Sequence, residues 1–436
     1  QQRLSDWFDP QLRVDRDLLR QLSVAVTQLT SGPIPPIARQ LEAQMLLAQV
    51  LFISYLEHRD IVGAEYRKQH SLETFHSLVK ARNGASIDAL IKLLKRDFNG
   101  DFLEPSEISW ASLNDRALEI IEKLLSRVNL QTGQTDFWNY DFSQIPVELL
   151  SGIYETFLQD ERKIDGAYYT PRMLAELAVE EAFDGVDDPS QLRVYDGACG
   201  SGILLTTAYR KIIAYREAAE QRALDIHERI SLLQKTIFGG DINRIACRVT
   251  AFSLYLCILE RLSPPDLARL QRDHDCKLPR LIGTNIAEGG KRGDFFSTDN
   301  PFSSAGNFDV VISNPPWREL RADEGATAIA WATENRVKLP HKQMAAAFAS
   351  KACDAAKPEG RIVLILPSSL ITAPTNADFL RQYTVRVGIE RMINLADFRR
   401  LLFAHAEHAC TVLRAINTPG LQDGHLVGRF EYWMPK

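Results

Sequence analysis

Apolar residues recur at two different spacings along this chain of 436 residues. Up to about residue 143 they fall three or four positions apart, which is the spacing of one face of an α-helix. The stretches that show this spacing most clearly are Leu46 to Glu57, Ile87 to Leu94 and Leu118 to Val128. Gly, Pro and Asn, which favour turns, interrupt the pattern at 31–36, 81–86 and 129–136. We therefore expect the first part of the chain to be all-helical.

From about residue 190 the pattern changes to short apolar runs rich in Val and Ile, separated by longer helical stretches. The runs are 192–196, 236–241, 309–314, 361–367, 391–397 and 410–416. Strands that alternate with helices predict an α/β fold, in which a mostly parallel sheet has helices on both faces. We expect a helical domain over residues 1–143 and an α/β domain over residues 144–436.

The residues that follow each predicted strand are candidates for a site, because ligands of parallel sheets bind beyond the carboxyl ends of the strands. The first run ends at Asp196 and continues as "DGACGSG", whose glycines permit a tight turn and a close approach of a ligand to the backbone. Such loops are common, and the spacing of the glycines is not that of dinucleotide-binding proteins. The second run ends at Asp241, which could bind both hydroxyls of a ribose. Asp241 could equally be the N-cap of the next helix.

A third candidate lies in "EGGKRGDFFS". Asp294 could bind the edge of an adenine ring, and Phe295 could lie against its face. A plain Gly-Asp turn is the competing interpretation.

The fourth candidate is "SNPPW", residues 313–317, at the end of an apolar run. Pro315 has no N–H and Pro316 favours an extended conformation before it, so the backbone carbonyls here are displayed as acceptors. Asn314 adds a side-chain carbonyl. Two acceptors suit an amino group with two hydrogens on a heteroaromatic ring, and Trp317 would offer an exposed flat face beside it. A structural turn could also use Asn-Pro-Pro, but it would not require Trp at an exposed end.

Composition and charge restrict the function further. The net charge of −5, from 51 basic and 56 acidic residues, argues against a protein that coats nucleic acid, so any such binding should be local. Six cysteines without a C-x-x-C pair suggest core thiols rather than a zinc site or a disulfide framework. Neither a membrane-spanning run nor a signal peptide is evident, and we expect a cytoplasmic protein with no membrane partner and no metal.

The segments "DGACGSG", "GDINR", "RGDFF" and "SNPPW" resemble, in this order, the successive motifs of class I S-adenosylmethionine-dependent methyltransferases that act on adenine N6 in DNA. "GAYYTP" (166–171) resembles the segment that precedes the glycine loop in the gamma subgroup, where the cofactor motif, the catalytic motif and a target-recognition domain follow one another. Residues 145–158 and 52–62 resemble the helical connector of type IIG restriction-modification enzymes and of type I methylation subunits. The resemblance implies a Rossmann-like sheet, S-adenosylmethionine as cofactor and DNA as partner.

The resemblance also implies a role for each matching residue. The residues implied to close over the methionine end of the cofactor are Tyr168, Tyr169, Thr170 and Pro171. Those implied to surround its amino acid and sugar are Asp196, Ala198, Cys199, Gly200 and Gly202. Those implied to bind its ribose and adenine are Asp241, Ile242, Asp294 and Phe295. Those implied to hold the target base are Asn314, Pro315, Pro316 and Trp317, with Phe403 as a second aromatic side chain, although a Phe in an apolar run is usually core.

The implied mechanism is direct methyl transfer to a flipped adenine. Flipping costs a few kcal/mol, and stacking on Trp317, worth roughly 1–3 kcal/mol, would offset it. Asn314 and the Pro315 carbonyl would accept hydrogen bonds from the amine and turn the nitrogen lone pair toward the methyl group. Positioning and electrostatics would supply most of the rate, without a metal or a covalent intermediate.

The sequence departs from the resemblance in three respects. Gly197 stands where the family commonly has Pro. Only the residues from 417 to 436 follow the last predicted strand, which is too short for a target-recognition domain, and we find no persuasive acid cluster of a nuclease. We therefore expect a specificity domain or subunit outside this chain, a possible nuclease domain or subunit, and weak DNA binding by the chain alone.

Two other functions stay open at this point. Asn-Pro-Pro followed by an aromatic residue also serves methyltransferases that act on glutamine amides in proteins or on guanine amines in RNA. A non-catalytic, cofactor-binding scaffold of a defence complex is the alternative of a different class, and an intact "SNPPW" counts against it.

Overall fold

The computed structural model describes residues 10–32, 35–98, 108–135, 170–260, 262, 266, 269, 277–303, 306–320, 325–402, 409–419, 421–422, 425–426 and 430–435. The chain divides into two compact units. One unit comprises residues 1–158 with 260–279, and the other comprises residues 159–259 with 280–436. The predicted domain boundary between residues 143 and 144 lies outside the described residues and stays a prediction.

The first unit is helical, as the apolar spacing predicted. Its helices are α2 (Pro10–Thr30), α3 (Gln40–His58), α4 (Ala64–His70), α5 (Phe75–Lys80), α6 (Gly84–Phe98) and α7 (Asp115–Leu125). The predicted break at 31–36 falls between α2 and α3. The apolar positions of the three periodic stretches are largely buried, and the indole N–H of buried Trp110 donates to Gln49 Oε1 at 3.1 Å. Apolar helix faces that pack against one another, with α3 buried on nearly all sides, therefore hold this unit together.

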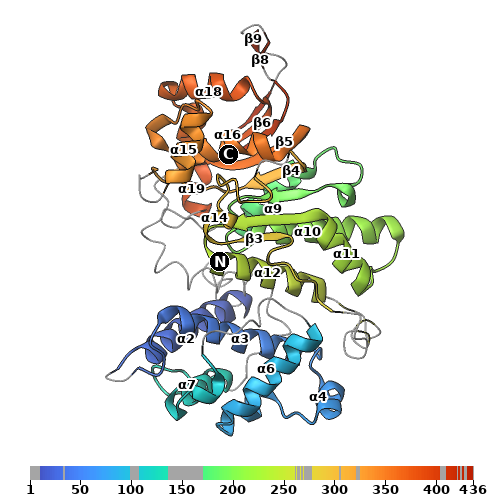
Figure 1. The fold of residues 1–436 in the computed structure, drawn as a ribbon, viewed down its shortest axis with the longest axis vertical. Coiled ribbons are helices and arrows are strands. Elements are labelled where there is room, and N and C mark those ends of the chain that lie inside the picture. The colour runs from blue at the N-terminus through green and yellow to red at the C-terminus, as the bar shows by residue number, and fades with distance from the viewer. Residues whose placement is uncertain are drawn as a thin grey trace, which may run out of the picture. The chain divides into compact units, whose positions relative to one another are not determined.

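The second unit is built on an eight-stranded sheet with the order β10-β6-β7-β5-β4-β1-β2-β3 (Figure 1). Its strands are β1 (Val194–Asp196), β2 (Ile237–Asp241), β3 (Ile286–Glu288), β4 (Phe308–Ser313), β5 (Ala356–Pro367), β6 (Gly388–Asn394), β7 (Cys410–Ile416) and β10 (Glu431–Trp433). All neighbouring strands are parallel except β7, which is antiparallel to both β5 and β6. A short hairpin, β8 (Leu421–Gln422) with β9 (His425–Leu426), stands apart from the sheet.

All six strands predicted from apolar runs are present, within a few residues of their predicted ends. The structure adds β3 and β10, which the sequence did not indicate. Each has only three residues, and neither forms a Val- and Ile-rich run, so no apolar pattern marked them. Their pairing with β2 and β6 makes them strands.

Helices cover both faces of the sheet, as expected for this fold class. One layer contains α9 (Arg172–Phe183), α10 (Ile203–Glu220), α11 (Ile226–Thr236) and α12 (Arg244–Leu259). The other contains α15 (Ala326–Glu334), α16 (Met344–Ala355) and α18 (Ala377–Thr384). Two shorter helices, α17 (Ser368–Thr372) and α19 (Arg399–Leu402), follow strands β5 and β6. A cluster of aromatic rings that includes Tyr195, Phe295 and Phe348 links the end of β1 to α16.

Helix α9 is tied to the sheet by ion pairs at its C-terminal end. The Glu181 carboxylate is buried and accepts from Arg391 of β6 at 2.9 Å and from Arg414 of β7 at 3.4 Å. Asp184 bonds the same two guanidinium groups. Because the helix begins just after Thr170 and Pro171, this anchor also fixes the place of those residues.

None of the helices in the described part of the chain is long and apolar enough to span a membrane. The described residues contain no cluster of His, Cys, Asp or Glu side chains that could hold a metal ion. Cys199, Cys247, Cys257, Cys353 and Cys410 are buried free thiols, as expected of core cysteines, and Cys276 lies outside the described residues.

Candidate active site

The first two predicted strand ends meet through the glycine loop after β1. The Gly200 N–H donates to Asp241 Oδ2 at 3.1 Å, and the Cys199 N–H donates to the Gly240 carbonyl at 3.0 Å. Gly200 and Gly202 have φ of +55° and +83°, values that L side chains rarely adopt, so the turn requires glycine at these positions. The loop therefore holds the β2 acid beside a backbone without side chains.

Asp241 is not the N-cap of the following helix. That position belongs to Asn243, whose Oδ1 accepts from the N–H groups of Ile245 at 2.9 Å and Ala246 at 3.3 Å. Asp241 instead receives the N–H of Asn243 at 2.8 Å and that of Gly200. The next side chain, Ile242, is 55% exposed, although it is a large apolar group. A carboxylate with an exposed apolar side chain next to it fits a ribose that carries a flat ring.

The segment around Asp294, the third predicted candidate, packs closely against the end of β2 at Asp241. Short helix α14 (Gly290–Gly293) leads into Asp294, and a Cβ added at Gly293 would lie 2.0 Å from the Asp241 carbonyl oxygen. The Asp294 carboxylate accepts from the Phe296 N–H at 2.9 Å and from the Thr327 hydroxyl. The Gly-Asp turn at residues 293–294 is therefore present. It does not exclude binding of a ligand by Asp294, because a carboxylate has about four lone-pair sites.

Asp196 is joined to the strand that carries "SNPPW". The Ser313 hydroxyl donates to Asp196 Oδ1 at 2.7 Å, and the Ala198 N–H donates to the same oxygen at 3.0 Å. Asp196 is only 1% exposed, and this burial raises the pKa of its carboxyl to about 7, against the two hydrogen bonds and with a contribution from the charge of Asp241. At neutral pH the carboxyl is therefore close to the midpoint of its titration.

Asn314 has one end of its amide bonded and the other end free. Its Nδ2 donates to the hydroxyl of buried Thr170 at 2.9 Å. Its Oδ1 is buried and accepts no hydrogen bond from any described residue. A buried acceptor without a donor costs roughly 1–3 kcal/mol. The site is therefore complete only when a donor lies next to Asn314 Oδ1.

Two family models match overlapping parts of the chain. Residues 146–261 match the family described as N-6 DNA Methylase, and residues 235–401 match the Eco57I restriction-modification methylase family. The first match contains the glycine loop, and the second contains Asp294 and Asn314. Together the two matches span residues 146–401, so more than half of the chain is similar to N6-adenine DNA methylases of restriction-modification systems.

Two curated relatives of restriction-modification systems are similar to part of this chain. It is 26% identical over 48% of its length to the type I restriction enzyme MjaIX methylase subunit of Methanocaldococcus jannaschii. It is 24% identical over 63% of its length to the type II restriction enzyme and methyltransferase RM.Eco57I of Escherichia coli. The matches cover 31% and 30% of those two relatives, so the chain spans about a third of their length.

Solved structures share the fold of this chain. The type IIL restriction-modification enzyme MmeI, solved in complex with DNA, has a TM-score of 0.65 at 14% identity, with 93% of this chain and 57% of that chain covered. A type I methyltransferase subunit from Streptococcus thermophilus has a TM-score of 0.54 at 16% identity, with 92% and 84% covered. These similarities support the α/β fold.

The expectation that Trp317 is exposed is wrong. Its side chain is 8% exposed, and its indole N–H donates to the Ile365 carbonyl of β5 at 3.3 Å. The acceptor lies 48 residues away in sequence, so no local pattern indicates this contact. Pro315 is also buried, whereas Asn314 and Pro316 are half-buried. The base-binding roles of all four residues stay proposals.

Phe295 is also more buried than a ring that lines a ligand would be. It is 3% exposed and lies 5.2 Å from the ring of Phe348, centroid to centroid. A Cβ added at Gly197 would lie 2.8 Å from this ring. Phe295 thus occupies the space that a side chain at position 197 would need, which explains why Gly replaces the family's usual Pro.

Gly197→Ala is expected to lower the free energy of unfolding by about 1–3 kcal/mol, because the added methyl group overlaps the confined Phe295 ring. The double variant G197A/F295L should recover part of the loss, since Leu can move away from the methyl group. Urea unfolding measures both. Gly240→Ala is the matched control, because its Cβ would be no closer than 3.5 Å to a neighbour. Equal losses in G197A and G240A would contradict the account.

Several predicted residues lie outside the described part of the chain, namely Tyr168, Tyr169 and Phe403. Among those described, Asp196, Ala198, Cys199, Gly200, Gly202 and Asp241 come together around the glycine loop. Sequence reasoning missed Ser313 and Asn243. The helix start after "GDIN" could have indicated Asn243 as a cap. A hydroxyl at the last position of an apolar strand was the available signal for Ser313.

Proposed function

We propose that this chain transfers a methyl group from S-adenosylmethionine to N6 of an adenine flipped out of DNA. The observation that carries the proposal is the buried, unpartnered Oδ1 of Asn314. An adenine amine is a donor of the required kind, and its two hydrogens match Oδ1 and the Pro315 carbonyl. The motif order and the family matches favour DNA as the substrate.

The residues around the glycine loop fit S-adenosylmethionine. Asp241 and Ile242 suit the ribose and one face of the adenine, and half-buried Asp294 suits the edge of that ring. Asp196 would face the positively charged end of the cofactor, which favours the ionised carboxylate. When bound, this cofactor supplies an electrophilic methyl group on a sulfonium sulfur. Phe295 would support the loop from below rather than line the ring, because it is buried.

At the target base, the work of the protein is orientation. The N6 lone pair of adenine is delocalised into the ring, so the nitrogen is a poor nucleophile until it becomes pyramidal. Asn314 Oδ1 and the Pro315 carbonyl would accept the two N–H groups and favour that geometry, with acceptors placed before the reaction begins. Because Trp317 is buried, stacking of the base on its indole requires a movement of the side chains that cover it.

Thr170 would set the direction of the Asn314 amide. Its hydroxyl accepts from Nδ2, which leaves Oδ1 as the end that faces the amine. The side chains are 144 residues apart in sequence, and α9 carries Thr170 to this point. We therefore assign Thr170 to positioning Asn314, in addition to the cofactor contact that the family resemblance implied.

Thr170→Val should lower kcat about 10-fold and leave the Kd of S-adenosylmethionine unchanged, because it removes one hydrogen bond worth about 1–1.5 kcal/mol. Thr170→Ser retains the hydroxyl and should restore most of kcat. Steady-state methyl transfer and calorimetric titration of the cofactor measure the two quantities. If T170V weakened cofactor binding as strongly as it slowed transfer, Thr170 would be a cofactor residue alone.

We further propose that DNA sequence specificity comes from a domain or subunit outside this chain. The described part of the chain shows no separate recognition domain, and the chain spans about a third of the two curated relatives. Those relatives are a type I methylase subunit and a combined restriction enzyme and methyltransferase. A restriction-modification or related defence system is the proposed setting, with a nuclease domain or subunit as a possible further part.

Tritiated methyl transfer tests the proposed function. Plasmid DNA, structured RNA and a glutamine-rich protein are offered side by side, followed by base analysis of the labelled product. Label in N6-methyladenine of DNA is expected. Label only in RNA or protein would assign the site to another planar amine. No transfer to any acceptor, together with measurable cofactor binding, would favour a non-catalytic scaffold.

A further inference from the structure

We infer that residues 335–343, here called the basic loop, contact a DNA phosphate beside the flipped nucleotide. The inference rests on the proposed function and names the surface of the protein that meets the DNA backbone. It starts from the negative net charge of the chain, which requires that any nucleic-acid contact be local. The basic loop provides such a local surface.

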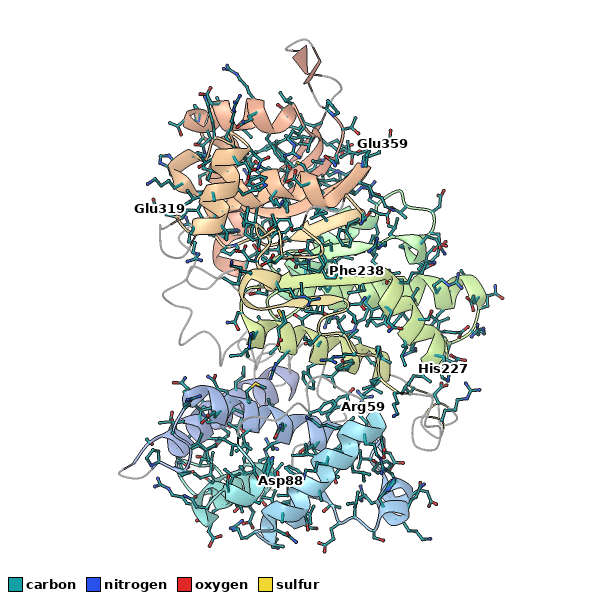
Figure 2. All side chains as sticks on the ribbon, in the orientation of Figure 1. Arg59, Asp88, His227, Phe238, Glu319 and Glu359 are labelled. Carbon is teal, nitrogen blue, oxygen red and sulfur yellow. The ribbon has the colours of Figure 1, made fainter. Side chains whose placement is uncertain are left out.

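The basic loop is fastened to the segment that directly follows Trp317. The Leu320 N–H donates to the Lys342 carbonyl at 2.7 Å, and the Met344 N–H donates to the Arg318 carbonyl at 2.9 Å. Between them, Glu319 forms an antiparallel bridge with Gln343. Glu319 marks this place at the edge of the second unit in Figure 2. Backbone hydrogen bonds thus attach the basic loop to residues 318–320, which follow Asn314 closely in sequence. These bonds do not depend on the side chains of the loop.

The other end of the basic loop is held by α18. Gln382 Nε2 donates to the Arg336 carbonyl at 2.6 Å, and Gln382 Oε1 accepts the Lys338 N–H at 2.8 Å. The Val337 N–H donates to the Ala332 carbonyl of α15 at 2.8 Å. Since both ends are attached, the basic loop is a platform with a defined shape.

Three basic residues of the loop have a left-handed backbone. The φ angles of Arg336, His341 and Lys342 are 54°, 49° and 50°. A left-handed conformation is unfavourable for a residue with a side chain, and Gly or Asn would adopt it more easily. His341 and Lys342 are consecutive, and two such residues persist only where surrounding contacts hold the backbone. Backbone strain of this kind is concentrated at functional sites.

The side chains of this loop present positive charge to solvent. Arg336, Lys338, His341 and Lys342 are all exposed. Lys338 forms an ion pair with Asp378 at 2.9 Å, and both groups are mostly exposed. Arg336, His341 and Lys342 form no ion pair with any residue that the structure describes. Glu334 is the described acid nearest in sequence, and Glu319 lies opposite Gln343 in the antiparallel bridge; neither forms an ion pair with these groups among the described residues.

A phosphate fits this surface better than a protein partner does. Lys and Arg offer only charge and N–H donors, His341 adds a ring N–H, and the loop presents no exposed large apolar side chain to bury. An enzyme that extrudes a base must also hold the backbone on each side of it, and phosphate contacts position DNA without reading its sequence. The basic loop would supply one such contact next to the catalytic motif.

The test compares the wild-type chain with the double variant R336Q/K342Q in fluorescence anisotropy with a short duplex at increasing salt, without methyl transfer. The variant should bind about 10-fold more weakly at low salt. The slope of log K against log salt should shrink by about 0.9, which is the value for one phosphate contact. Calorimetric titration should give an unchanged Kd for S-adenosylmethionine.

The control is K211Q/K235Q on α10 and α11, which removes the same charge away from the catalytic motif. An equal loss in both double variants would overturn the inference, because net charge alone would explain it. An unchanged salt slope in R336Q/K342Q would also overturn it, as would a wild-type chain that binds no duplex at low salt. Loop-dependent binding without N6-methyladenine formation would instead count against the proposed function.

Discussion

Asn314→Ala is expected to lower the rate of methyl transfer by at least about 100-fold. The variant removes the side-chain acceptor that the amine of the target base would meet, and loss of one preorganised polar group in an active site costs roughly 10²–10³ in kcat. Single-turnover transfer from S-adenosylmethionine to DNA measures the effect. The Kd of the cofactor should stay within about two-fold of the wild-type value, because the described contacts of Asn314 reach Thr170 and not the glycine loop.

The same variant should not destabilise the protein. Alanine removes a buried oxygen that has no partner among the described residues, and this relief offsets the loss of the bond to Thr170. Asn314→Asp is the companion variant, since it keeps an acceptor of the same shape and adds a charge. Full activity in N314A, or a loss matched by an equal loss of cofactor affinity, would remove Asn314 from the catalytic role.

Asp196→Asn is expected to stabilise the protein at pH 8 by up to about 4 kcal/mol. Burial raises the pKa of Asp196 from its ordinary value of 3.8 to about 7. Between these values the native protein binds more protons than the unfolded chain, so this group lowers the free energy of unfolding as pH rises from about 4 to about 7. A shift of about three units corresponds to about 4 kcal/mol. Asn does not ionise and keeps Oδ1 as acceptor for Ser313 and Ala198.

Urea unfolding of the wild type and D196N at several pH values measures this difference. It should be near zero below pH 4, grow up to about pH 7 and then stay constant. Ser313→Ala removes a hydrogen bond that opposes the rise of the Asp196 pKa. The fall in the free energy of unfolding with rising pH should therefore extend to higher pH in that variant. A stability difference between wild type and D196N that does not change with pH would show that Asp196 ionises freely.

D196N should at the same time bind S-adenosylmethionine about 10- to 100-fold more weakly. A hydrogen bond to a charged group is worth roughly 1.5–3 kcal/mol, and the neutral amide cannot replace it. The predictions for N314A and D196N together describe a site that lowers the free energy of unfolding when no ligand is bound. Its buried carboxylate and its unpartnered amide oxygen both destabilise the fold until ligands arrive, which is the usual relation between stability and activity.

Much of the arrangement around the glycine loop could be predicted from the sequence. Asp196, the glycine loop and Asp241 each follow an apolar run, and parallel strands bring such ends to one edge of the sheet. Whether Asp241 is the N-cap of the following helix could be decided only from the structure, because the capping position depends on where the helix begins. Asn243 starts it, two residues later than the sequence suggested.

The base side was predicted less well, because burial depends on what covers a residue. Trp317 was expected to be exposed from its place after two prolines, yet β5 binds its indole N–H and leaves it 8% exposed. The bond between Thr170 and Asn314 joins residues that no local pattern relates. The left-handed residues of the basic loop are likewise held by contacts with Gln382 and with residues 318–320.

The order of residues alone determined the alternation of strands and helices and the acids at the strand ends. These follow from periodicity and from local chemistry, which a short window of sequence contains. Only the tertiary structure decided which of those groups are buried, which are bonded and which acceptor is left open. Burial and hydrogen bonding depend on neighbours that lie far apart in the chain, and these neighbours meet only when the sheet has formed.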